Sequence, residues 1–105
     1  MAEKTTIFVV DDDEAVRDSL QALLQARGFE VRAFESAPKL LAAIGTNTRG
    51  CVLTDVRMPE MDGLELQRRL AGHMLPVVVM SGHGDIPMAV QAMRDGAVDF
   101  VEKPY

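Results

Sequence analysis

The stretch TIFVVDDDE, residues 6–14, decides the fold class of this chain. Its first half is apolar and β-branched without alternating polar residues, which is the pattern of a parallel strand buried on both faces. Its second half is a run of acidic residues, and charged side chains follow a buried strand where its carboxyl end reaches solvent. We therefore predict a central strand over residues 5–10 that ends at an acidic edge.

The same alternation of strand and helix continues along the chain. Short apolar runs predict strands, and between them apolar residues recur at helical spacing with capping residues, prolines and glycines at the expected ends. Strands that alternate with helices are joined by right-handed crossovers, so the fold class is α/β, a doubly wound five-stranded parallel sheet covered on both faces. The predicted strands are 5–10, 30–34, 51–55, 76–81 and 98–102, and the predicted helices begin after Asp13, Ser36, Asp62 and near Asp85.

Length and composition indicate one soluble globular domain, residues 1–105. Of the 105 residues, 48% are hydrophobic and 26% are charged, which is ordinary globular usage. No apolar run approaches the roughly 18 residues of a membrane span, and no basic leader opens the chain. A net charge of −5 argues against binding to a nucleic acid backbone. We expect a cytoplasmic protein without membrane contact, in which the single cysteine, Cys51, is a buried core residue.

Polar side chains stand at the carboxyl ends of the predicted strands, and they define a candidate site. Ligands of open parallel sheets bind beyond these ends, where the strand order reverses. The side chains that we expect to converge at this edge are Asp11 and Asp12 after the first strand, Asp55 at the end of the third, Ser81 at the end of the fourth and Lys103 after the fifth.

The expected cluster favours a magnesium-dependent phosphoryl transfer. Two carboxylates about 4 Å apart repel each other by roughly 4 kcal/mol at an effective dielectric constant near 20, so a cation or a proton has to offset the charge. Oxygen ligands without His or Cys suit Mg²⁺ rather than Zn²⁺. Lys103 would pair with phosphoryl oxygens and Ser81 would donate to one of them. Asp55 is the natural nucleophile, and its attack on phosphorus gives an acyl phosphate.

Simpler structural roles are also open for several of these residues. Asp13 is the expected N-cap of the first helix. Ser81 alone reads as a turn residue before Gly82. The loop GHGD, residues 82–85, lacks the Lys and Ser/Thr of a P-loop, and His83 within it reads as a solvated histidine near the site.

Four motifs together resemble the receiver domain of two-component response regulators. The likeness covers nearly the whole chain, and its last third is particularly similar to FixJ-like regulators, transcription factors with a helix-turn-helix output domain. The resemblance implies a flavodoxin-like sheet with the strand order 2-1-3-4-5. The motifs are VVDDDE at 9–14, TDVRMPEMDG at 54–63, VVMSGHG at 78–84 and VDFVEKP at 98–104.

The resemblance also implies residue roles at the site. Asp55 is the phosphoacceptor, whose donor is a phosphohistidine on a sensor histidine kinase. Asp12 and Asp55 bind Mg²⁺, or Mn²⁺, together with the backbone carbonyl of Arg57, and Asp11 acts through a metal-bound water. Lys103 and Ser81 contact the phosphoryl group. The domain loses its own phosphoryl group by hydrolysis but is not a turnover enzyme on an external substrate.

Other implied roles concern the response to phosphorylation. Ser81 and Phe100 form the switch pair, and the peptide bond between Lys103 and Pro104 is cis. Helix four and strand five become a partner surface. By helical spacing, Val90 and Arg94 fall on that face, where a phosphorylation-dependent homodimer is expected.

Two further positions, Arg57 and His83, occupy places at which the family tunes the lifetime of the phosphoryl group. The sequence does not show whether Arg57 and His83 lengthen or shorten that lifetime.

The chain departs from the family pattern at its end. The family has a fifth helix beside the first one, whereas this sequence stops at Tyr105. We therefore expect the sheet face beside the first helix to be half bare, which favours a partner, a swapped or rearranged dimer, or lower stability. A piece of a longer regulator is the simplest explanation. In that case DNA is contacted only through an output domain that is absent here.

Two other functions remain open from the sequence. Asp11 and Asp13 form the Asp-x-Asp pattern of haloacid dehalogenase-like phosphatases, although Glu14 and Ala15 do not fit the residues that should follow. A receiver that binds partners without being phosphorylated is the second alternative.

Overall fold

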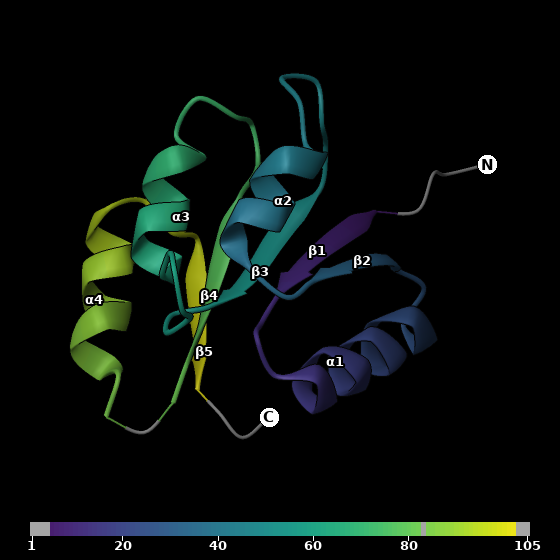
Figure 1. Cartoon of the computed structure of the whole chain (residues 1–105), viewed down its shortest axis with the longest axis horizontal. Helices are drawn as coiled ribbons and strands as arrows, with labels where there is room; N and C mark the ends of the chain where they lie inside the picture. The colour runs from purple at the N-terminus through teal and green to yellow at the C-terminus, as the bar shows by residue number, and fades with distance from the viewer. Residues whose placement is uncertain (1–4, 83, 103–105) are drawn as a thin grey trace.

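The computed structural model describes residues 5–82 and 84–102, which form a parallel five-stranded sheet with four helices (Figure 1). The strand order is β2-β1-β3-β4-β5, and every neighbouring pair is parallel. The predicted fold class and strand order are therefore confirmed. The strands are β1 (Thr6–Val10), β2 (Glu30–Phe34), β3 (Cys51–Asp55), β4 (Val77–Ser81) and β5 (Asp99–Glu102). The helices are α1 (Glu14–Ala26), α2 (Ala37–Ala43), α3 (Gly63–Arg69) and α4 (Ile86–Arg94).

Side-chain caps begin three of the helices, as the sequence predicts. The carboxylate of Asp13 accepts hydrogen bonds from the backbone N–H groups of Ala15 at 2.9 Å and Val16 at 3.3 Å. Ser36 accepts from Lys39 N–H and Asp62 from Glu65 N–H. These bonds satisfy donors that have no partner inside the helix.

Helix α4 begins differently. Asp85 occupies its N-cap position, but its side chain makes no capping hydrogen bond to the helix. Pro87 in the first turn reduces the number of backbone donors that need a cap. The carboxylate of Asp85 is engaged elsewhere, in contacts described with the candidate site.

The two faces of the sheet carry cores of unequal size. The larger core lies beneath α2, α3 and α4, and its buried residues include Phe8 and Val10 of β1, Val52 of β3 and Val79 of β4. The smaller core lies on the other face, where α1 packs on β1 and β2 (Figure 1). Its fully buried members are Val9, Leu20 and Met80. Strand β1 therefore supplies side chains to both cores, as its uninterrupted apolar run predicts.

On the α1 side, the sheet is only partly covered among the described residues. Val101 of β5 pairs with Met80 and is 39% exposed, and Leu53 of β3 is half-buried. No helix among the described residues packs on β5 from this side. Cys51 is half-buried rather than fully buried, so the predicted burial of this residue was too high.

Gly63 brings the start of α3 against the end of β3. A Cβ atom at this position would lie 2.5 Å from the backbone oxygen of Asp55 and 3.0 Å from Cα of Val56. The N–H of Gly63 also donates to the Val56 carbonyl at 2.8 Å. Only glycine permits so close an approach, so the Asp-Gly turn at 62–63 fixes the loop that follows the candidate phosphoacceptor Asp55.

A search of the described residues for a membrane-spanning helix finds none with the necessary length and hydrophobicity.

Candidate functional site

Three carboxylates meet at the carboxyl edge of the sheet. Asp11, Asp12 and Asp55 each contribute one oxygen atom, and these three atoms lie within 4.8 Å of one another. Asp11 is fully buried, Asp55 is 7% exposed and Asp12 is exposed. Asp11 and Asp12 follow β1, and Asp55 is the last residue of the adjacent strand β3. The structure thus brings together the three acids that the sequence predicts to converge.

Backbone contacts hold Asp11 at this edge. Its N–H donates to the Phe34 carbonyl of β2 at 3.1 Å, and its own carbonyl accepts from Arg17 Nη1 at 2.8 Å. Its carboxylate oxygen Oδ1 accepts from Asp13 N–H at 2.9 Å. The carboxylate of Asp13 is itself occupied in capping α1. The acidic run therefore divides into Asp11 and Asp12 at the cluster and Asp13 at the helix.

Asp55 is fixed by the sheet and by the loop that follows it. It pairs with Met80 of β4, and Val56 N–H donates to the Met80 carbonyl at 3.0 Å. Its oxygen Oδ1 accepts from the backbone N–H of Arg57 at 3.3 Å. One carboxylate oxygen of Asp55 belongs to the cluster with Asp11 and Asp12.

Ser81 is the last residue of β4 rather than part of a turn. It is fully buried, and among the described residues its hydroxyl has no hydrogen-bond partner. A buried hydroxyl without a partner costs about 1–3 kcal/mol, so this hydroxyl is a candidate hydrogen-bond donor to a ligand at the carboxyl edge.

Phe100 lies on the neighbouring strand β5, where it pairs with Val79 and packs, partly buried, against the larger core. The predicted switch pair therefore lies on adjacent strands.

The Arg57 side chain reaches from the loop after β3 to the loop after β4. Its Nε forms an ion pair with Oδ1 of Asp85, whose other oxygen accepts from Gly82 N–H at 3.3 Å. The hydrogen bond and negative charge of Asp85, and to a lesser degree the charge of Asp55, raise the pKa of the Arg57 guanidinium above its ordinary value. Sequence reasoning missed Asp85 at this edge, because the residue was interpreted only as the start of a helix.

The remaining predicted residues divide between α4 and positions outside the description. Val90 is 43% exposed and Arg94 is exposed, and Val90 lies in a row with the exposed Ile86 and Met93 on α4. The predicted roles of Lys103, of the Lys103–Pro104 peptide bond and of His83 fall outside the described residues.

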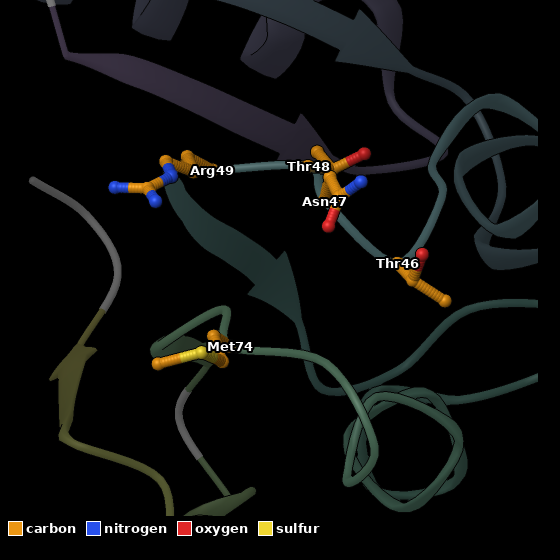
Figure 2. A pocket seen from close by; sticks show the side chains of 5 residues that line it. All are labelled: Thr46, Asn47, Thr48, Arg49 and Met74. Carbon is orange, nitrogen blue, oxygen red and sulfur yellow. The ribbon is translucent and has the colours of Figure 1, made fainter.

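A separate pocket lies at the opposite edge of the sheet, before strands β3 and β4. Its volume is about 370 Å³, and its lining side chains come from two loops (Figure 2). Because these loops lead into the amino ends of the strands, the pocket is remote from the acidic cluster. The lining residues are Thr46, Asn47, Thr48, Arg49 and Met74.

A parallel sheet in this order, with an acidic cluster at the carboxyl ends of β1 and β3, defines a flavodoxin-like doubly wound domain. The family model for the response regulator receiver domain matches residues 7–105. The chain belongs to this family, whose members are phosphorylatable signalling switches of two-component systems rather than turnover enzymes. Family membership, together with the capping role of Asp13, removes the haloacid dehalogenase-like alternative.

Curated relatives and solved structures agree with this assignment. The chain is 50% identical over 107 residues to the transcriptional regulatory protein FixJ of Bradyrhizobium diazoefficiens, covering 100% of this chain and 52% of that protein. It is 48% identical over 105 residues to the response regulator protein TmoT of Ectopseudomonas mendocina, covering 98% of this chain and 48% of that protein. The crystal structure of FixJ-N superposes with a TM-score of 0.91 at 46% identity, covering 99% of this chain and 85% of that one. The chain spans about half the length of the curated relatives it matches.

Proposed function

We propose that this domain is switched on when Asp55 accepts a phosphoryl group from a phosphohistidine of a sensor histidine kinase, in a Mg²⁺-dependent reaction. The single observation that carries the proposal is the meeting of Asp11, Asp12 and Asp55 oxygens within 4.8 Å. A cation or a proton has to offset like charges this close, and three carboxylates at adjacent strand ends offer a divalent cation the hard oxygen ligands that it prefers.

The residues present fit Mg²⁺ or Mn²⁺. Asp12 and Asp55 are proposed as direct ligands with the backbone carbonyl of Arg57, and Asp11 as a partner through a bound water. When bound, the ion neutralises charge on the phosphoryl oxygens. Asp11 is buried and its orientation is fixed by Asp13 N–H, which suits a residue that orients a ligand.

In the proposed transfer, an oxygen of Asp55 attacks phosphorus. The new O–P bond forms as the P–N bond of the phosphohistidine breaks, and the imidazole nitrogen leaves with the electron pair. The Ser81 hydroxyl donates to a phosphoryl oxygen, which gives this buried donor its partner. The Lys103 ammonium pairs with a second oxygen. Water later hydrolyses the acyl phosphate and restores the Asp55 carboxylate, so the domain resets itself.

The proposed response runs from β4 to α4 and β5. Movement of Ser81 toward the phosphoryl group makes room for Phe100 to turn inward. The exposed row on α4 that contains Val90, with Arg94 nearby, then forms a homodimer contact. In this proposal, residues 1–105 act as the receiver, and DNA is contacted only through an output domain outside this sequence.

Phosphorylation with a small acyl phosphate and Mg²⁺ tests the proposal. The purified chain is expected to form an acid-stable, base-labile adduct, detected by intact mass, and Asp55→Asn is expected to abolish it. Asp13→Asn is the matched control, because asparagine also caps a helix well, and it should leave adduct formation nearly unchanged. An adduct that persists in Asp55→Asn would refute the assignment. Magnesium binding without any adduct in the unmodified chain would favour the phosphorylation-independent interaction module.

A further inference from the structure

The ion pair between Arg57 and Asp85 joins the two loops that flank the candidate phosphoacceptor. Arg57 follows Asp55 by two residues in the loop after β3, and Asp85 follows Ser81 by four residues and leads into α4. The two side chains meet although 28 positions separate them in the sequence. Any change in this pair therefore connects the candidate site to the start of α4.

The two partners differ in freedom. The Asp85 side chain is 13% exposed, and its second oxygen accepts from Gly82 N–H. The Arg57 side chain is 67% exposed. Asp85 is largely enclosed and Arg57 is largely solvated. If the ion pair breaks, the Arg57 side chain therefore moves to a new partner more readily than the Asp85 side chain does.

The position of Asp85 indicates a role other than capping. A carboxylate at an N-cap ordinarily accepts from the first helical N–H groups and is favoured by the helix dipole. Here the carboxylate turns back to Gly82 and Arg57 and makes no capping bond to α4. Asp85 therefore does not use its carboxylate to cap α4, and the carboxylate is placed instead to hold Arg57.

Arg57 also lies within the electrostatic reach of Asp55. Its backbone N–H donates to Asp55 Oδ1, and the Asp55 carboxylate attracts its guanidinium. A phosphoryl group carries about −1.5 to −2 charge near neutral pH and presents three oxygens that suit a guanidinium better than one carboxylate does. Phosphorylation of Asp55 therefore creates a competitor for Arg57 close to its present partner.

We infer that Asp85 and the phosphoryl group on Asp55 compete for the Arg57 guanidinium, so that phosphorylation exchanges the Arg57–Asp85 pair for an Arg57–phosphoryl pair. Asp85 is then a positioning residue: it holds Arg57 beside α4 in the unphosphorylated domain and changes its own contacts at the start of α4 when Arg57 leaves. This inference rests on the proposed function and specifies how that site communicates with α4.

A double-mutant cycle with beryllofluoride, a mimic of the phosphoryl group, tests the competition in the presence of Mg²⁺. Asp85→Asn weakens the competing pair while keeping an acceptor for Gly82 N–H, so beryllofluoride is expected to bind roughly two- to fivefold more tightly, as for an ion pair with one exposed partner. In an Arg57→Ala background the same substitution should have no effect. Asp95→Asn, at the other end of α4, is the charge-matched control and should leave binding unchanged.

A second measurement uses a different variant in the absence of beryllofluoride, so it does not depend on whether Asp85→Asn folds. Arg57 is largely exposed, and Arg57→Ala should fold normally. Without beryllofluoride, this variant should shift the amide resonances of Gly82 and Asp85 in the same direction as beryllofluoride shifts them in the unmodified chain.

The outcomes separate the inference from the proposed function. Three outcomes overturn the exchange and leave the proposed function standing. They are a gain in beryllofluoride binding that persists in the Arg57→Ala background, an equal beryllofluoride affinity in all backgrounds, and amide shifts in unrelated directions. Failure of the unmodified chain to bind beryllofluoride overturns the proposed function, and the exchange with it.

Discussion

At the scale of single residues, the candidate site depends on close contacts that tolerate little change. Gly63 has no room for a side chain because the Asp55 carbonyl and Val56 lie where its Cβ would stand. Asp11 and Asp13, two positions apart, have separate tasks, since one faces the cluster and the other caps α1. The acidic run is therefore a set of individually placed groups rather than a solvated patch.

Gly63→Ala is expected to destabilise the domain by about 1–3 kcal/mol, because a methyl group at 2.5 Å from a backbone oxygen forces the loop to move. Urea unfolding followed by circular dichroism measures the change. Gly72→Ala is the control, since a Cβ there meets nothing within 4 Å, and its free energy of unfolding should stay close to that of the parent. Equal effects of the two substitutions would contradict the close approach.

Glu65 gives the domain a pH-dependent contribution to stability. A hydrogen bond from Arg69, with the charges of Arg69 and Arg68, lowers the pKa of this carboxyl from its ordinary value of 4.5. A lowered pKa in the folded state means that the stabilisation is complete above the unfolded pKa and is lost as pH falls through the folded pKa. Glu65→Gln should therefore reduce stability at pH 7 and have progressively less effect below about pH 4.

Thermal unfolding of the parent and of Glu65→Gln across pH 3 to 7 provides the measurement. The same substitution in an Arg69→Met background is the control, because the largest cause of the pKa shift is then removed. A difference between parent and Glu65→Gln that is constant with pH would show that the charge of Glu65 makes no contribution.

At the scale of elements, α4 combines an inward face and an outward apolar row. Ala89 and Ala92 are buried against the sheet. Ile86, Val90 and Met93 are exposed, and their spacing of four and three residues places them on one face of the helix. Exposed apolar rows of this kind are typical of contact surfaces. The same helix begins at Asp85, so a change in the Asp85 contacts acts on the helix that carries the row.

Val90→Asp is expected to weaken the proposed beryllofluoride-induced dimer by roughly 30-fold in dissociation constant, or about 2 kcal/mol, because a charge replaces an apolar contact. Sedimentation velocity with and without beryllofluoride checks this. Leu23→Asp on α1 is a matched control, since Leu23 is similarly exposed on a different helix. Loss of the dimer in Leu23→Asp and not in Val90→Asp would move the contact to α1.

At the scale of the whole molecule, the fold could be predicted from the sequence more completely than the site. Uninterrupted apolar strands and capped amphipathic helices determine a parallel sheet, and this part of the prediction needs only local patterns. The order of the strands came from the resemblance to receiver domains. The Arg57–Asp85 pair joins two loops whose paths depend on tertiary packing, so no spacing rule could find it.

Two further residues show where local patterns fail. Gln67 reads as a surface residue of a helix, yet it is buried and its Nε2 donates to the Ala92 carbonyl at 3.0 Å, which links α3 to α4. Cys51 lies in an apolar run but is only partly buried. Both outcomes depend on how neighbouring elements approach, which a single stretch of sequence does not contain.

The unequal cores make the two halves of the acidic cluster differ in mechanical support. Asp55 is the last residue of β3, whose Val52 lies in the larger core. Asp11 and Asp12 follow β1, which contributes to both cores and is also tied to α1 through Asp13 and Arg17, and α1 rests on the smaller core. Fluctuations that lift α1 therefore reach Asp11 and Asp12 before they reach Asp55. The proposed affinity of the cluster for a cation should therefore depend on local opening of α1, while the proposed nucleophile Asp55 keeps its position.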